Sequence, residues 1–338
     1  MAIRYYFTYA LILLTALCGW AQEGSSAYNF LNIPLSSRIY GLGGVNITLV
    51  DDDVTTVDQN PALLGQEMDK QISLSYMRYV SGSNFAGIRY ANALGAHGTI
   101  TGAIQYFGYG SMAQTDEYGQ QIGSFSPKDV LFSCAYSHDI TDNLRGGINL
   151  KMAYSAYEKY SAFAIATDLG INYYLPERDL SLSLVVCNLG GQVKRFNEAY
   201  DRLPIDVRIG WSQSFGTFPV RFSITMWNLT KWHLPYYDYG DGSSSSQVVK
   251  KDSFVSNLFR HLVFGADLIV SPNWYIGLGY NYKTRTDMLT YSRSFLSGFS
   301  IAGGFRVKSF GVGAAFAQPA TGAMTFMLNL NCSLSELL

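Results

Sequence analysis

The chain has 338 residues, of which 14% are charged and 15% are aromatic, and its formal net charge is −1. The charged fraction is well below the roughly 25% of an average globular protein, and the near-zero net charge favours neither a nucleic-acid partner nor a polybasic membrane anchor. Beyond the amino terminus, no stretch approaches the roughly 20 apolar residues that a membrane-spanning helix needs. The hydrophobic residues are therefore distributed along the chain, as they are in strands.

The first 21 residues are typical of a secretory signal peptide. Arg4 precedes an apolar run, and Gly19-Trp20-Ala21 places small residues at the expected cleavage position. We therefore predict a signal peptide over residues 1–21 that is cleaved near Ala21. One alternative is lipidation of Cys18, although Leu17 is larger than the residue that normally precedes a lipidated cysteine. The other is an uncleaved membrane helix, for which the run is short.

Residues 22–70 lack the alternation of the later chain and form a separate element. They include apolar residues that need burial, such as Phe30 and Leu31, together with glycines, an acidic run and an Asn-Pro-Ala triplet. The segment is long enough to fold inside a barrel, so we predict a plug, or hatch, over 22–70. Its motif residues are Gly43, Gly44, Asp52, Asn60, Pro61 and Ala62.

From residue 71 onward, apolar and polar residues alternate. In 144–154 the even positions are apolar or glycine, whereas the odd positions include arginine, asparagine and lysine. Such period-two segments are strands with one apolar and one polar face. We expect about fourteen of them, an even number that suits a bacterial barrel with both termini on its periplasmic side.

The connections between these strands differ in length in a regular way. Short turn sequences such as 141–143 and 176–179 follow every second strand, and the long connections are all on the other side, at 110–127, 195–204, 234–256 and 286–297. Short turns on one side and long loops on the other are typical of outer-membrane barrels. The sequence therefore predicts an all-β fold, a transmembrane antiparallel β-barrel over 71–338, located in the cell outer membrane.

One face of each strand must then contact hydrocarbon. Apolar residues such as Leu182 and Leu184 are expected to point outward, and the charged residues lie on the opposite faces. Because an arginine or lysine in lipid costs about 2–4 kcal/mol at the midplane, we expect these charges in the lumen: Arg145, Lys151, Asp168, Arg208, Arg221, Asp267, Lys283 and Arg306. A soluble β-sandwich also alternates, but it would expose the aliphatic faces to water.

The sequence contains no recognisable catalytic or metal-binding pattern. The four histidines are scattered without metal-ligand spacing. Ser137-His138-Asp139 is contiguous, and neighbouring residues of a strand point to opposite faces, so these three cannot form a triad. We therefore expect no catalytic residue, no metal site and no cofactor. A hydrolase at the barrel rim remains an alternative.

Two of the long connections are candidate partner-binding surfaces. Tyrosine supplies a large contact area at little entropic cost, and tyrosines are concentrated before the serine tract at 243–246. A solvated loop above interfacial tyrosines would have the same composition. The candidate residues are Tyr236, Tyr237, Asp238 and Tyr239 in one connection, and Tyr118 and Phe125 in the other.

The plug sequence resembles that of a known superfamily. The stretches 41–44 (Gly-Leu-Gly-Gly), 51–53 (three aspartates) and 60–62 (Asn-Pro-Ala) are similar to the N-terminal signature of FadL-like outer-membrane proteins. The stretches 188–192, 203–206, 227–232 and 260–265 are similar to the PorQ-like group within that superfamily, which are components of the type IX secretion system of Bacteroidetes. This resemblance covers essentially the whole mature chain and implies a fourteen-stranded barrel with an N-terminal plug.

The resemblance implies a non-enzymatic role. PorQ-like proteins hold the surface protein PorZ and, through it, PorU and the related barrel PorV in an attachment complex that links secreted cargo to lipopolysaccharide. We therefore expect an outer-membrane anchor for a surface-exposed partner, in contact with outer-membrane lipid and lipopolysaccharide and with no nucleic-acid partner. The alternatives are a FadL-like transporter of hydrophobic small molecules, which needs an apolar pocket leading to a gap in the wall, and an open porin, which needs an unplugged lumen.

Overall fold

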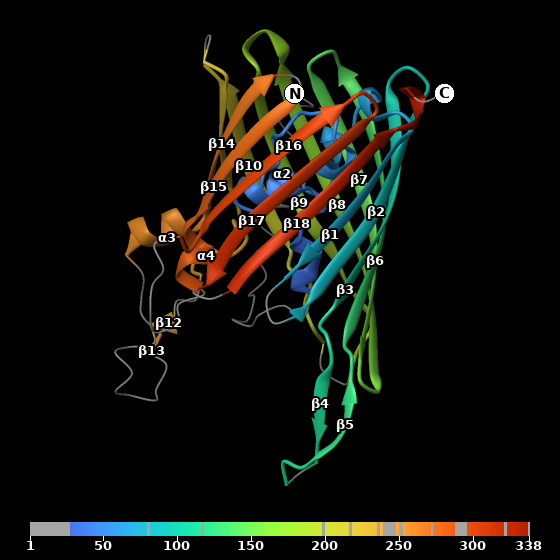
Figure 1. Cartoon of the computed structure of the whole chain (residues 1–338), viewed down its shortest axis with the longest axis vertical. Helices are drawn as coiled ribbons and strands as arrows, with labels where there is room; N and C mark the ends of the chain where they lie inside the picture. The colour runs from blue at the N-terminus through green and yellow to red at the C-terminus, as the bar shows by residue number, and fades with distance from the viewer. Residues whose placement is uncertain are drawn as a thin grey trace, which may run out of the picture.

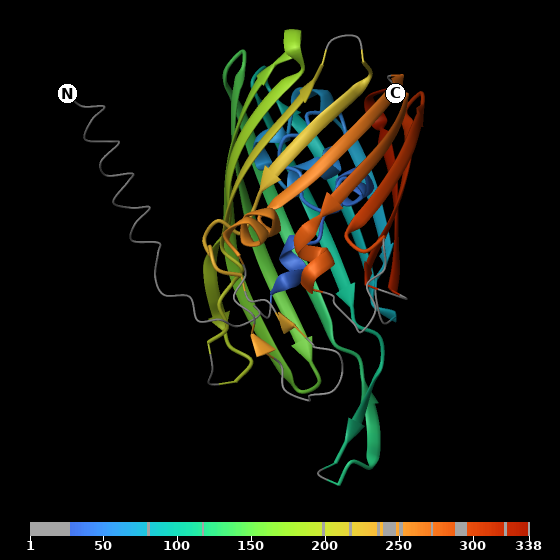
Figure 2. The ribbon, with the colours of Figure 1, turned by 90° about the vertical axis from the view of Figure 1, so that its left-hand side faces the viewer.

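The computed structural model describes residues 28–79, 82–116, 118–197, 200–215, 218–234, 237–238, 248–249, 253–271, 273–287, 296–320 and 323–336. Over these residues the chain forms a closed antiparallel β-barrel, with the N-terminal segment inside it (Figures 1 and 2). The predicted signal peptide and residues 22–27 of the predicted plug lie outside the described residues. None of the described helices is long and apolar enough to cross a membrane.

The barrel wall contains fourteen strands in the described part of the chain, and β1 pairs with β18 to close it. The predicted all-β, fourteen-stranded antiparallel barrel is thereby confirmed. The strands are β1 Gln71–Arg78, β2 Asn84–Leu94, β3 Gly98–Gly108, β6 Lys128–Thr141, β7 Leu144–Tyr157, β8 Tyr160–Leu175, β9 Leu180–Lys194, β10 Asp206–Ser214, β11 Val220–Met226, β14 Leu262–Ser271, β15 Trp274–Asn281, β16 Phe299–Val307, β17 Phe310–Ala320 and β18 Ala323–Ser333.

The alternation of the sequence matches the two faces of the wall. In β7, Leu150 and Met152 are exposed on the outside, whereas Asn149 and Lys151 are buried on the lumen side. This arrangement leaves a band of aliphatic and aromatic side chains around the barrel and places the polar side chains against the N-terminal segment. The core of the molecule is therefore the contact between that segment and the inner face of the wall.

The two ends of the barrel differ in their connections. At the turn end, where β1 begins and β18 ends, the strands are joined by short turns such as 142–143 and 308–309. At the opposite, loop end, the connections contain two small hairpins, β4 Met112–Thr115 with β5 Gln121–Phe125 and β12 Tyr237–Asp238 with β13 Val248–Val249. The β4–β5 hairpin extends beyond the barrel (Figure 1).

Two helices also lie at the loop end, α3 Phe254–Arg260 and α4 Tyr282–Asp287. The second helix corrects one expectation, because Lys283 belongs to α4 and does not continue the lumen face of β15, which ends at Asn281. The alternation Asn281-Tyr282-Lys283 is compatible with a strand, but the side chain of Asn281 accepts a hydrogen bond from the backbone N–H of Thr284, as a helix cap does (3.1 Å).

The segment before the strands passes through the lumen from the loop end to the turn end. Tyr28 packs with Leu131 and Ala153 on the loop-side half of the wall, and the segment reaches β1 at the turn end. Figure 2 shows it as the blue ribbon inside the barrel. Its elements, with the remaining short helices, are η1 Asn29–Asn32, α2 Ser37–Gly41, η2 Val54–Asp58, η3 Pro61–Leu63, η4 Gln66–Met68, η6 Pro176–Arg178 and η7 Leu334–Glu336.

Candidate functional site

At the turn end, the segment inside the lumen is attached to the wall by ion pairs. The Arg38 Nε on α2 donates to the Asp267 carboxylate of β14 at 3.0 Å, and the same guanidinium pairs with Asp51. Arg306 of β16 pairs with Asp52. Burial alone would lower the pKa of Arg38, but Asp51 and Asp267 raise it above its ordinary value, so the guanidinium stays charged.

In the middle of the lumen, Asp58 of the plug pairs with Arg89 of β2. The Asp58 carboxylate also accepts hydrogen bonds from the Leu35 backbone N–H (3.2 Å) and from the Gln105 side chain (3.3 Å). Burial raises the pKa of Asp58, and the charge of Arg89 opposes this shift. Asp58 therefore joins the plug to two strands of the wall at mid-height.

A second polar cluster lies opposite, on β7 to β10. Lys151 pairs with Asp168 at 2.7 Å, and both belong to the predicted lumen set. Asn188 forms a bulge in β9 with a positive φ of 57°, and its backbone N–H donates to Asp168 at 2.7 Å. Arg208 donates to Gln59 of the plug at 2.9 Å. The plug is therefore hydrogen-bonded to this side of the wall as well.

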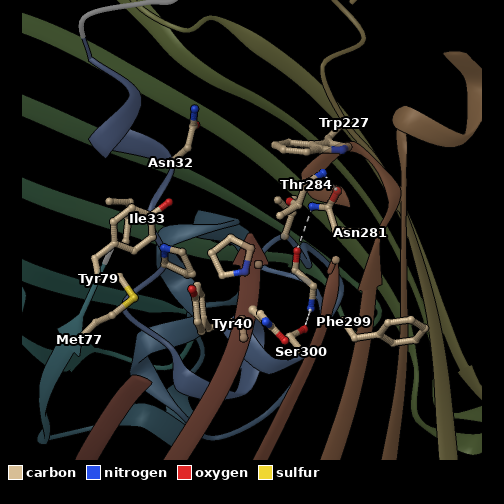
Figure 3. Close-up of a pocket in the computed structure, with 18 of the residues that line it drawn as sticks. Asn32, Ile33, Tyr40, Met77, Tyr79, Trp227, Asn281, Thr284, Phe299 and Ser300 are labelled. Atoms are coloured by element: carbon tan, nitrogen blue, oxygen red, sulfur yellow. Dashed lines mark hydrogen bonds between the residues drawn. The ribbon is translucent and has the colours of Figure 1, made fainter. Parts of the chain in front are cut away.

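A cavity of about 210 Å³ lies at the loop end, between the plug and the ends of β1, β15, β16 and β17 (Figure 3). In the close-up, Met77, Tyr79 and Ile33 lie on one side of it, and Asn281 and Ser300 on the other. The full lining is Asn29, Asn32, Ile33, Pro34, Tyr40, Gly43, Gly44, Val45, Met77, Tyr79, Trp227, Asn281, Thr284, Gly298, Phe299, Ser300, Ala317, Gln318 and Pro319. This set contains no Asp, Glu, Lys, Arg or His.

The phenols of the cavity are also neutral. Burial raises the pKa of Tyr40 above its usual range, and it likewise raises the pKa of Tyr79. The Tyr40 hydroxyl forms a hydrogen bond with Thr325 of β18. Because a smaller engineered cavity of about 150 Å³ lined by apolar side chains binds benzene, this cavity has the size and polarity for a small uncharged molecule.

The predicted plug residue Gly43 forms part of the cavity floor. Its backbone N–H donates to the Ser300 hydroxyl at 3.0 Å, and its carbonyl accepts from the Asn281 side chain at 3.1 Å, the two dashed contacts in Figure 3. Gly43 and Gly44 both have positive φ, 100° and 83°, which side chains rarely adopt. A Cβ at Gly43 would also overlap Val263 of the wall. The glycine pair therefore permits a close approach of the plug backbone to β14–β16.

The other predicted plug residues lie nearer the turn end. Asn60 accepts a hydrogen bond from the Ala62 N–H at 2.9 Å and donates to the Ile47 carbonyl at 2.9 Å. Pro61 begins η3 and packs against Gly147 of β7, where a Cβ would overlap the Pro61 backbone. Ala62 is buried and Asp52 holds its ion pair at the turn end. These residues position the plug and do not line the loop-end cavity.

The predicted partner-binding residues are distributed over two separate hairpins. Tyr118 lies between β4 and β5 and is 88% exposed, whereas Phe125 at the end of β5 is partly buried. Tyr237 and Asp238 form β12, and Tyr236 and Tyr239 lie outside the described residues. The two hairpins are separate sheets, so the structure does not join these residues into one patch.

The sequence did not predict the loop-end cavity. Its lining residues Tyr40, Met77, Trp227 and Ser300 come from parts of the chain that are far apart in sequence. Among the described residues, no group of three or more His, Cys, Asp or Glu side chains is arranged to hold a metal ion. The uncharged lining of the loop-end cavity suits an uncharged molecule.

The sequence matches no known protein-family profile and no curated protein. Solved barrels nevertheless superpose on it. The deltaS2S3 mutant of TodX, a monoaromatic hydrocarbon channel, gives a TM-score of 0.56 at 9% identity over 89% of this chain and 100% of that chain. The Pseudomonas putida toluene transporter TodX gives 0.52 at 10% identity, over 88% and 96% of the two chains. A Pseudomonas aeruginosa FadL homologue gives 0.50 at 11% identity, over 89% and 98%.

The chain has the fold of these barrels. This agrees with the fourteen-stranded barrel and the N-terminal segment before its strands that the resemblance of the plug motif implies. At such low identity the likeness concerns the fold, including the N-terminal segment that precedes the strands, and it leaves the role of the loop end to be argued from the chain itself.

Proposed function

We propose that this protein is a non-enzymatic outer-membrane anchor, whose plugged barrel holds a surface-exposed protein at its loop end. The observation that carries the proposal is the attachment of the plug to the wall by Arg38–Asp267 and Arg89–Asp58, inside a wall whose fourteen described strands pair all the way round. Such a lumen favours a role at the outer surface over passage through the barrel. The loop end then faces outside, as short turns at the other end suggest.

The proposed partner is a PorZ-like surface protein and, through it, PorU- and PorV-like components of a type IX attachment complex. Support comes from the β4–β5 hairpin, which extends beyond the barrel rim (Figure 1) and exposes the apolar and aromatic side chains of Met112, Tyr118 and Ile122. Tyrosine and methionine are enriched in protein interfaces. Tyr118, Phe125, Tyr237 and Asp238 remain the proposed contacts, with Tyr236 and Tyr239 outside the described residues.

The anchor is tested by affinity purification of the tagged full-length protein from native outer membranes, with reconstitution of the same preparation into liposomes. We expect one other protein to co-purify, and protease added to intact cells should remove that protein. The liposomes should not swell in solutions of small sugars. Replacing 112–125 by a short turn is expected to reduce its recovery. Absence of any surface protein, or rapid swelling, would overturn the proposal.

A second candidate is uptake of a small hydrophobic molecule, and the fold likeness supports it more directly than it supports the anchor. The specific observation is the uncharged loop-end cavity of about 210 Å³, together with the hydrocarbon channel and toluene transporter that share the fold. Against it, each of the fourteen described wall strands pairs with a neighbour on both sides, so the described strands leave no opening between two neighbours through which a bound molecule could leave.

This second candidate predicts saturable binding of toluene to the purified protein in detergent, observed through the fluorescence of Trp227 at the cavity edge. Ile33→Trp, which fills the cavity, should abolish binding. Ile276→Trp, on the outer face of β15, is the matched control and should leave it intact. If wild type and both variants respond alike, the cavity is not the site and the transport candidate fails.

A further inference from the structure

The barrel wall is much taller on one side than on the other. β7, β8 and β9 contain 14, 16 and 15 residues, whereas β11 and β15 contain 7 and 8. At about 3.4 Å per residue and a tilt of roughly 40°, seven or eight residues rise only about 18–20 Å, less than the apolar band of about 25 Å around an outer-membrane barrel. On its short side, the wall ends within the hydrocarbon at the loop end.

Helix α3 lies where the short wall ends. Figure 1 shows it outside the barrel, beside the loop ends of β14 and β15. The ring of Phe259 on α3 lies 6.2 Å from the ring of Phe264, and Phe264 shares the outward row of β11, β14 and β15 with Ile224 and Tyr280. The helix is therefore continuous with the lipid-facing surface of the wall.

A helix on the surface of a water-soluble protein buries its apolar side and exposes its polar side, whereas α3 does the opposite. Two of its polar residues, Asn257 and Arg260, are buried against the protein, where they donate to the carbonyls of Trp232 (2.6 Å) and Leu234 (2.9 Å), and Ser256 is partly buried. Three of its four apolar residues are exposed, Phe254 by 69%, Val255 by 60% and Phe259 by 43%, and Leu258 is partly buried. In water this arrangement would expose apolar surface at a cost of about 25 cal/mol per Å².

We propose that α3 is a membrane-embedded element, whose exposed face of Phe254, Val255 and Phe259 contacts lipid acyl chains in the leaflet at the loop end. It extends the apolar band over the part of the wall where β11 and β15 are too short. Lipid is the occupant because the face is continuous with the hydrocarbon-facing row of Phe264, and because an interfacial helix typically buries its apolar side about 5–10 Å below the headgroups. This inference rests on the barrel fold and is independent of the partner proposed above.

The test uses an environment-sensitive fluorophore attached to Val255→Cys, in a full-length chain whose Cys18, Cys134, Cys187 and Cys332 are replaced by alanine. The protein is reconstituted in phosphatidylcholine vesicles that carry nitroxides either near the headgroup or near the chain end. Ile122→Cys on the β4–β5 hairpin is the aqueous control, and Leu278→Cys on the outward face of β15 is the mid-membrane control. Folding of each variant is checked by its heat-dependent shift in gel mobility.

We expect the Val255 label to be quenched by the headgroup nitroxide several-fold more than the Ile122 label, as for a side chain about 5–10 Å below the interface. The Leu278 label should respond most to the chain-end nitroxide. A Val255 label that responds like Ile122, and that aqueous iodide quenches equally well, would overturn the proposal. It would favour a protein partner for this face.

A second measurement uses the native chain, in case the cysteine-free background does not fold. A phosphatidylcholine with a photoreactive diazirine in its acyl chain is added to the vesicles, and adducts are mapped by mass spectrometry. Adducts on the peptide that contains Phe254 and Phe259, at a yield similar to that on β15, support the inference. Adducts on β15 without any on α3 contradict it.

Discussion

The two ends of the lumen hold the plug by different physical means. At the turn end, Arg38 and Asp52 form ion pairs with the wall. At the loop end, Gly43 is held beside an uncharged cavity by two neutral hydrogen bonds, because its N–H donates to Ser300 and its carbonyl accepts from Asn281. A second cavity, of about 200 Å³ at the turn end, has Arg38, the three aspartates and Arg306 in its lining and shares no residue with the first.

Helix α2 separates the two cavities, because its residues Ser37 and Arg38 line the turn-end cavity and Tyr40 lines the loop-end one. The two cavities are similar in volume, so the ends differ in charge: ion pairs hold the plug at the turn end, and neutral hydrogen bonds hold it at the loop end. Breaking a buried ion pair should therefore have larger consequences than breaking a neutral contact.

The largest effect is expected for Arg38→Ala. It leaves the buried Asp267 carboxylate with the more distant guanidinium of Arg221, at 3.9 Å, and removal of one member of a buried ion pair typically costs about 3–5 kcal/mol. We expect the free energy of unfolding, measured by guanidinium titration in vesicles, to fall by about that amount. We also expect ion conductance across planar bilayers to appear as the plug loosens.

The matched control for Arg38→Ala is Arg145→Ala, whose partners Asp139 and Glu67 are partly exposed. This substitution should cost less than about 1 kcal/mol. Equal effects would contradict the comparison.

The second-largest loss of stability is expected from a matched pair of substitutions in the plug, at Leu35 and at Ile33. Leu35 is fully buried among Met77, Phe85 and Phe107, whereas Ile33 is partly buried at the cavity. Leu35→Ala should cost about 2–5 kcal/mol, because it opens a new void in a packed cluster. Ile33→Ala only enlarges an existing cavity and should cost less than about 2 kcal/mol. Guanidinium titration in vesicles measures both, and a reversed order would show that the plug is packed more tightly at Ile33 than at Leu35.

The third-largest loss of stability is expected where the plug backbone packs closely against the wall. A Cβ at Gly279 of β15 would overlap the backbone of Gly43, whereas a Cβ at Gly303 of the neighbouring β16 would find its nearest atom, the Tyr275 carbonyl oxygen, at 3.8 Å. Gly279→Ala should therefore destabilise the protein by about 1–3 kcal/mol through overpacking, and Gly303→Ala should be close to neutral. The same titration compares them, and a tolerated Gly279→Ala would mean that the plug backbone can move away from the wall.

The period-two pattern predicted the wall well, because each strand contacts hydrocarbon with one face and the polar lumen with the other. Lys151, Asp168 and Asp267 are buried on the lumen side for that reason. The β4–β5 hairpin escaped prediction because both of its faces are exposed and no alternation is imposed on it. The helix Tyr282–Asp287 was not predicted, because residues 281–283 alternate between polar and apolar and so continue the pattern of β15.

The loop-end cavity could not be predicted, for a different reason. Its lining combines plug residues such as Ile33 and Tyr40 with the loop ends of β1 and β16, so it depends on how the plug sits in the barrel. The plug motif marked Gly43, but only the positive φ and the contact with Ser300 show why glycine stands there. Local patterns specify strands and turns, whereas contacts across more than two hundred residues need the folded barrel.

The smallest effect is expected for Ser300→Ala at the loop end. The Ser300 hydroxyl donates to the Gly41 carbonyl at 2.9 Å and accepts from the Gly43 N–H. The loss of such a neutral hydrogen bond typically costs about 0.5–1.5 kcal/mol. We expect a guanidinium midpoint only slightly below that of wild type and no conductance, because Arg38 still holds the other end of α2. If Ser300→Ala opened the barrel as Arg38→Ala should, the two ends would share the closing role. The plug would then not be held chiefly by the ion pairs on which the anchor proposal rests.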